Sequence, residues 1–112
     1  MKKYEIETYV AKNGHSPFQE WLDGLKDKTV QTKLYARLSR ASFGNFGDYK
    51  IIKGAKGLFE MREHSGGGYR IFYSVIGNKI VLLLAGSAKK DQKKAITRAK
   101  VYLADYERSK KP

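Results

Sequence analysis

The segment "LFEMREHSGGGYRIFYSVIGNKIVLLLA", residues 58–85, decides the fold of this 112-residue chain. It holds three runs rich in aromatic and aliphatic residues, at residues 58–64, 69–75 and 79–85, separated by "SGGG" and by "GN". Short glycine-containing breaks between such runs are typical of antiparallel β-hairpins. The last run lacks alternation of polar and apolar residues, which predicts an interior strand that is buried on both faces.

The length of the glycine loop determines which side chains share a face of the first hairpin. A three-residue loop pairs Arg62 with Arg70 and Met61 with Ile71, whereas a four-residue loop puts the two arginines on opposite faces. Only the three-residue loop produces a coherent apolar face, so we predict that register. Because like charges directly opposite each other are destabilising, an anionic group should lie between the arginines. It is either a phosphate or a local carboxylate such as Glu60.

The flanking sequence predicts one more strand and three helices. Residues 3–10 alternate with period two, as a strand does. Ser16 and Gln19 have the spacing of a capping box at the start of a first helix. Apolar residues at helical spacing predict a second helix at about residues 28–42 and a last helix at about residues 91–108.

This order of elements predicts the α+β class, with an N-terminal strand and two helices packed on an antiparallel sheet and a C-terminal helix. A short extended piece at residues 49–53 adds to the sheet. Residues 1–112 are expected to form a single domain, with a frayed tail at about residues 109–112.

Composition restricts the classes of function. The chain has 23 Lys and Arg residues against 11 Asp and Glu residues, a net charge of +12, so an acidic partner such as RNA is expected. It has no cysteine, which excludes disulfides, thiolate zinc sites and cysteine nucleophiles. Its glycine-rich stretches lack the P-loop pattern, its alternating N-terminal residues lead us to expect no signal peptide, and its longest apolar run, residues 80–85, is too short to span a membrane. We therefore expect a cytoplasmic protein without a metal, a cofactor or a membrane partner.

Further basic side chains are candidates for the site and for RNA contacts. His64 lies two residues after Arg62, so in a strand its side chain points to the same face, and it stands at the edge of the glycine loop. Lys90 follows the last strand, at the mouth of that face. The outer face of the second helix and the segment after the last strand are either solvated or contact RNA, through Lys33, Arg37, Arg40, Lys89 and Lys93.

Four segments together resemble one known family: "FQEWLDGLKD", "ARLSRASFGNFGDYK", "LFEMREHSGGGYRIFYS" and "VLLLAGSAKKDQKKAITRA". In this order they are similar to the RelE/ParE toxin superfamily, and more narrowly to its HigB-like branch of addiction module killer proteins. The resemblance implies a RelE-like fold. It also implies an activity, because RelE and HigB members are endoribonucleases that cut mRNA, commonly in the ribosomal A site, and are held inactive by a cognate antitoxin.

The resemblance also assigns roles to residues. Arg70 matches the arginine after the Gly-Tyr pair that contacts the scissile phosphate in RelE-type toxins. Arg62 falls where RelE has a basic residue on the preceding strand, and Lys89 or Lys90 matches the basic position after the last strand.

Two departures from the RelE pattern concern proton transfer. Glu60 stands where RelE has a further lysine, and no tyrosine lies near Ala95, where RelE has one in its active site. They leave the general base open between His64 and a lysine such as Lys90.

The sequence therefore predicts the toxin of a type II toxin–antitoxin pair, acting as a metal-independent mRNA endoribonuclease that yields 2′,3′-cyclic phosphate and 5′-hydroxyl ends. Its expected partners are mRNA, the ribosome and a HigA-like helix-turn-helix antitoxin. Two alternatives have the same fold or charge: a ParE-like poison of DNA gyrase, and a non-enzymatic RNA-binding accessory domain.

Overall fold

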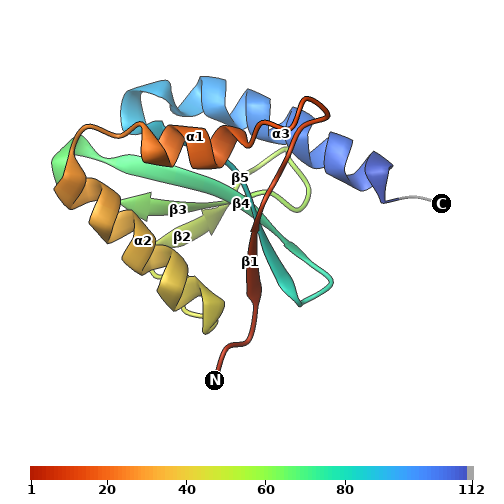
Figure 1. The fold of residues 1–112 in the computed structure, drawn as a ribbon, viewed down its shortest axis with the longest axis horizontal. Helices are drawn as coiled ribbons and strands as arrows, with labels where there is room; N and C mark the ends of the chain where they lie inside the picture. The colour runs from red at the N-terminus through yellow and green to blue at the C-terminus, as the bar shows by residue number, and fades with distance from the viewer. Residues whose placement is uncertain (111–112) are drawn as a thin grey trace.

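A computed structural model describes residues 1–110 of the chain, so the predicted frayed tail lies partly outside the described residues. A central sheet carries helices on both of its faces (Figure 1). The elements follow one another as β1 (Glu5–Thr8), α1 (Pro17–Asp23), α2 (Lys28–Ser42), β2 (Tyr49–Ile51), β3 (Phe59–Glu63), β4 (Tyr69–Ile76), β5 (Ile80–Ala88) and α3 (Gln92–Ser109). The predicted α+β class and the predicted order of elements are confirmed.

The sheet has five strands in the order β1-β5-β4-β3-β2. Strands β2 to β5 are antiparallel, as predicted, whereas β1 joins the edge of β5 in parallel. The pairing of β3 with β4 places Arg62 opposite Arg70 and Met61 opposite Ile71, which confirms the register predicted for the glycine loop. Strand β5 is interior along its first half, and its residues from Val81 to Ser87 are buried, as expected for a strand covered on both faces.

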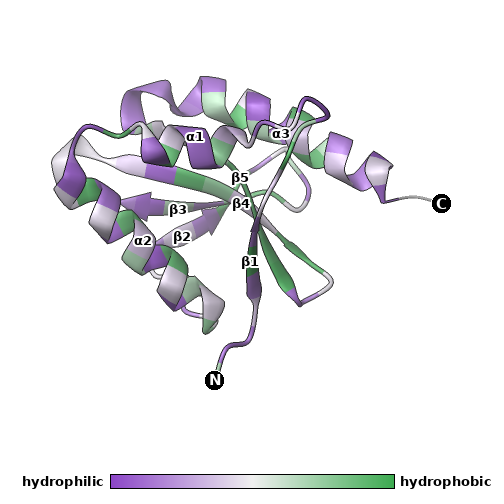
Figure 2. Ribbon diagram, viewed as in Figure 1, coloured by the Kyte–Doolittle hydropathy of each residue, from purple (hydrophilic) through white to green (hydrophobic). Residues whose placement is uncertain are grey.

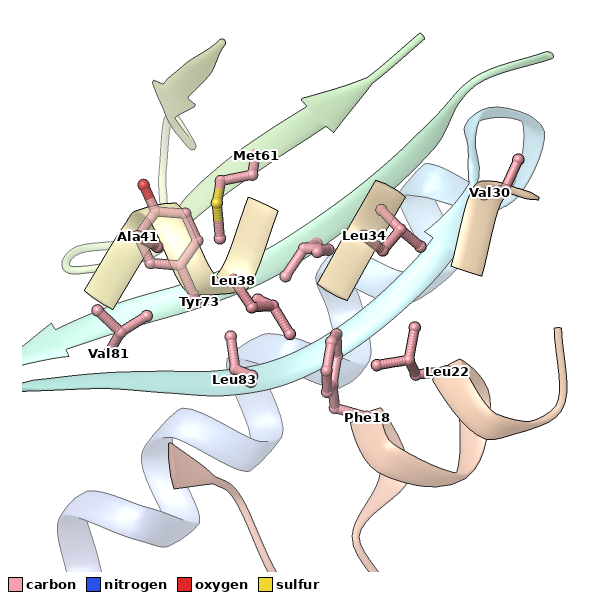
Figure 3. Packing of buried hydrophobic residues seen from close by; sticks show 11 residues of the cluster. Phe18, Leu22, Val30, Leu34, Leu38, Ala41, Met61, Tyr73, Val81 and Leu83 are labelled. Carbon is pink, nitrogen blue, oxygen red and sulfur yellow. The ribbon is translucent and has the colours of Figure 1, made fainter. Parts of the chain in front are cut away.

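Each face of the sheet has its own hydrophobic core. Helices α1 and α2 pack Phe18, Leu22, Leu34 and their neighbours onto one face (Figure 3). Helix α3 packs Ala95, Ala99 and Leu103 onto the other. Figure 2 shows apolar colour along β4 and β5 and polar colour on much of the helix surface turned away from the sheet. The helices do pack against the sheet as expected, but not on one side of it: α1 and α2 cover one face and α3 covers the other.

A β-bulge reverses the alternation of side chains near the end of β5. Tyr73 pairs with Leu83 but Phe72 pairs with Ala85, so β5 has one extra residue at this point. An extra residue shifts every later side chain to the other face. Gly86 therefore faces α1, and Ser87 lies on the α3 face together with Arg70.

Two local predictions are wrong. Ser16 precedes α1 but makes no side-chain capping bond, and Gln19 donates instead to Asp23 at 2.9 Å. The N-terminal strand spans only Glu5–Thr8 and is shorter than the predicted residues 3–10, and Val10 beyond its end is 55% exposed.

Candidate functional site

Four side chains form a row across the sheet on its α3 face. Arg62 on β3 lies opposite Arg70 on β4, and Ser87 on β5 lies opposite Arg70 on its other side. Asp48, just before β2, continues the row, because its carbonyl accepts a hydrogen bond from the Arg62 backbone N–H at 2.8 Å. The hairpin register and the bulge together produce this row.

Arg70 is a buried cation with unused hydrogen-bonding capacity. It is 5% exposed, and its Nη1 donates to the Tyr69 carbonyl at 3.1 Å. Its Nε lies 3.9 Å from Oε2 of the fully buried Glu60 and has no hydrogen-bond partner among the described residues. Glu60 instead accepts a hydrogen bond from Gln92 of α3 at 2.9 Å. A guanidinium fixed in this way can still donate to an anion that reaches it.

Arg62 and His64 share one carboxylate. Arg62 donates to Oδ1 of Asp48 from Nη2 at 2.9 Å and from Nε at 3.2 Å, while His64 Nε2 lies 2.6 Å from Oδ2. The hydrogen bonds from His64 and Arg62 lower the pKa of Asp48. The carboxylate is therefore ionised and His64 Nε2 is the donor, which leaves Nδ1 of a neutral ring as an acceptor.

Each arginine has a local carboxylate beside it, but the structure shows no carboxylate shared by the two among the described residues. Glu60, named from the sequence, lies beside Arg70, and Asp48 lies beside Arg62. Asp48 was missed because it lies in the loop before β2, fourteen positions from Arg62, and only strand pairing brings the two together. Its signal in the sequence is an acidic residue directly before a short extended piece.

The segment after β5 brings Lys89 to the edge of this row. Its backbone N–H donates to the Gly68 carbonyl at 3.0 Å. A Cβ at Gly68 would lie 3.3 Å from Lys89 Cβ and 3.8 Å from Arg70 Nη1, so the two basic side chains border the same spot. Lys90, in the short turn before α3, and Lys93, in the first turn of α3, follow as exposed residues.

One predicted RNA contact is corrected by the structure. Arg37 was expected on the exposed face of α2, but it is 7% exposed and donates to the backbone carbonyls of Arg62 (2.6 Å), Phe46 (3.0 Å) and Asp48 (3.2 Å). Its place on the helix turns it towards the loop before β2. Lys33 and Arg40 are exposed, as expected, and Lys33 also donates to Ser65 Oγ at 2.9 Å.

The cluster combines several cations with two carboxylates. Arg62 pairs with Asp48, Arg70 and Lys50 lie beside Glu60 with Lys50 Nζ at 3.8 Å, and Lys89 borders Arg70. Buried or partly buried donors of this kind stabilise negative charge that develops on a bound group. The arrangement suits an oxyanion with several oxygens, such as a phosphate.

The fold defines the class to which this site belongs. The structure superposes on an arginine-to-alanine double mutant of the E. coli toxin RelE in the free state, with a TM-score of 0.62 and 19% sequence identity, over 88% of this chain and 95% of that one. The chain thus has the RelE-like fold.

The sequence identifies the family within this fold. The chain belongs to the family described as Phage derived protein Gp49-like (DUF891), whose model matches residues 20–109. It is 40% identical to an uncharacterised protein of Haemophilus influenzae over 84 residues, which are 75% of this chain and 83% of that protein. Within residues 1–110, no helix is both long and apolar enough to span a membrane.

Proposed function

We propose that this protein is the toxin of a type II toxin–antitoxin pair, of the HigB-like branch, and that it cuts mRNA in the cytoplasm without a metal. Membership of the Gp49-like family and the structural likeness to the toxin RelE support the toxin assignment. The single observation that carries the nuclease assignment is the register of Arg62 and Arg70. It fixes the two arginines as cross-strand neighbours on one face of the sheet, and the buried Arg70 has an Nε without a partner among the described residues.

In the proposed reaction a ribose 2′-hydroxyl attacks the adjacent phosphate. A base removes the 2′-hydroxyl proton, the new P–O bond closes a 2′,3′-cyclic phosphate, and the 5′-oxygen leaves with a proton from an acid. Arg62 and Arg70 hold the non-bridging oxygens and stabilise the extra charge of the phosphorane. Arg62 contributes through the donor groups that its contact with Asp48 leaves unused.

His64 is the base that the geometry favours over Lys90. Asp48 accepts from His64 Nε2 and orients the ring, which leaves Nδ1 to act as the proton acceptor. The His64 side chain is 70% exposed, and a substrate can reach it. Lys90, or the neighbouring Lys89, then supplies the proton to the leaving 5′-oxygen.

Exposed basic side chains on α2 and around the start of α3 would hold the RNA backbone. Lys33 and Arg40 on α2 and Lys89 and Lys93 near α3 remain the proposed contacts, since all four are exposed. Phosphate neutralisation by such residues provides affinity without reading the sequence. The ribosome, with mRNA in its decoding site, is the proposed target.

One experiment separates this proposal from its two rivals. Purified protein is incubated with translating ribosomes and, in parallel, with DNA gyrase and plasmid. We expect cut mRNA in the first reaction and unchanged plasmid topology in the second. Gyrase-dependent DNA breaks would favour a gyrase poison, and RNA binding without cleavage would favour an accessory domain.

The proposed partner is a small antitoxin with a HigA-like helix-turn-helix fold, encoded beside the toxin gene. A free protein with a net charge of +12 would bind RNA indiscriminately, so it requires a partner that blocks its basic surface. We expect co-expression with the adjacent open reading frame to restore growth and the two proteins to co-purify. A neighbouring gene product that neither binds nor protects would contradict the toxin–antitoxin assignment.

A further inference from the structure

A second concave site opens at the edge of β5, between α1 and α3. Strand β1 pairs with β5 only as far as Leu83, so the end of β5 has no strand beside it on that edge. The hollow left there has a volume of about 360 Å³, within the range of small-molecule pockets. Its lining includes Trp21 and Leu25 on the α1 side, Tyr69 and Ser87 from the sheet, and Lys94 and Arg98 on α3.

Trp21 forms a fixed aromatic wall of this hollow. A Cβ at Gly86 would come within 2.1 Å of Trp21 Cε3 and 2.2 Å of Cζ3, so the indole lies directly against the β5 backbone. The ring of Tyr69 stands 6.4 Å away at an interplanar angle of 52°. Fixed aromatic faces of this kind stack nucleobases of any sequence.

The polar groups of the hollow match the edge of a base and its phosphate. Ser87 is 3% exposed, and its Oγ has no hydrogen-bond partner among the described residues. A buried hydroxyl without a partner is costly unless a ligand supplies one. The carboxylate of Asp91 can accept from an exocyclic amino group, and Lys94 and Arg98 are exposed cations that can contact phosphate.

The hollow adjoins the arginine row. Ser87 lies directly opposite Arg70, and Ala88, which also lines the hollow, precedes Lys89. We propose that this hollow binds one unpaired nucleobase of single-stranded RNA, stacked on Trp21, while the arginine pair holds a neighbouring phosphate. The proposal rests on the proposed nuclease function for its role, which is to select the RNA and to fix its position at the arginines.

The chain itself provides the reporter for a test, because Trp21 is its one tryptophan. We would titrate the protein with a short single-stranded RNA and with an abasic RNA of the same length and charge, and record tryptophan emission. A base stacked on the indole should quench the emission, and the abasic RNA should bind more weakly without quenching. Equal responses to the two RNAs, or no response to either, would overturn the proposal.

Substitutions of residues that line the hollow test whether RNA binds there. Ser87→Ala removes only an unpartnered hydroxyl, so the fold should persist while RNA affinity falls about two- to tenfold. Arg98→Ala should weaken binding more than Lys56→Ala, a matched loss of one exposed positive charge in the loop between β2 and β3. Trp21→Leu, followed by anisotropy of labelled RNA, should lower affinity about five- to 150-fold. Unchanged affinity in folded Ser87→Ala and Arg98→Ala proteins would contradict the assignment.

Cleavage and base binding are read separately, so the two proposals can fail separately. Base-dependent quenching without any cleavage would leave the binding site standing and reject the nuclease. Cleavage without base-dependent quenching would support the nuclease and reject the base-binding site. If the antitoxin alters tryptophan emission and RNA does not, the hollow is a protein-docking surface and our inference is wrong.

Discussion

Arg37 connects helix α2 to the loop before β2 and to β3 through three backbone carbonyls. Hydrogen bonds from a buried charged group are worth about 1.5–3 kcal/mol, and a carbonyl left without its donor adds a desolvation cost. We predict that Arg37→Ala lowers the free energy of unfolding by about 2–4 kcal/mol in a urea titration. Arg40→Ala, on the same helix but exposed, should change it by about 0.5 kcal/mol or less. Equal effects of the two substitutions would contradict the structural role of Arg37.

Arg70 has a structural role in addition to its proposed catalytic one, because Glu60 is fully buried beside it. Arg70→Ala should reduce the cleavage rate about 10²–10³-fold, the scale for one preorganised charge stabiliser. It should also destabilise the fold, because the buried carboxylate of Glu60 would keep only the half-exposed Lys50 as a cation. The double variant Arg70→Ala, Glu60→Gln should recover stability but not activity. Recovered cleavage in the double variant would show that Arg70 acts only through the fold.

At the scale of elements, the residues that precede α1 and α2 differ in whether they cap the helix. Asp27 caps α2 by accepting from the Val30 N–H at 3.1 Å, whereas Ser16 makes no such bond at the start of α1. We predict that Asp27→Ala costs about 1 kcal/mol of unfolding free energy and that Ser16→Ala costs almost nothing. Thermal melts of both variants measure the difference. A comparable loss in Ser16→Ala would mean that the capping box forms in solution.

Local sequence predicted the elements well because each carries its own periodicity. Helix α2 begins at Lys28 and ends at Ser42 as expected, and the register of β3 and β4 followed from the need to bury Met61 with Ile71. The failures occur where tertiary contacts override local signals. Arg37 has the spacing of an exposed residue, and only the position of the loop before β2 shows that it is buried.

The candidate site was predictable in part, for the same reason. Arg62 and Arg70 are cross-strand partners within one hairpin, so their pairing could be predicted from the sequence of that hairpin alone. Asp48 reaches Arg62 only through β2, and the Trp21 hollow joins a helix, a strand end and a second helix. Sequence spacing contains no information about such distant contacts.

For the molecule as a whole, the net charge of +12 predicts RNA binding that weakens as salt rises, with a slope set by the number of phosphates neutralised. Each phosphate neutralised on a single strand should steepen the fall of log affinity with log salt by about 0.7. We predict a linear plot whose slope becomes less steep by about this amount in Arg40→Ala or Lys93→Ala. A slope that is unchanged in both variants would remove these residues from the proposed RNA surface.

The central claim is that the arginine pair serves an attack by the ribose 2′-hydroxyl on the neighbouring phosphate. The most direct measurement compares cleavage of one RNA with that of the same RNA carrying a single 2′-deoxy sugar at the cut site, presented on ribosomes. We predict cleavage of the first, with a 2′,3′-cyclic phosphate end, no cleavage of the second, and no cleavage of either by the Arg62→Ala, Arg70→Ala double variant. Equal cleavage of both RNAs, or full activity of the folded double variant, would contradict the account.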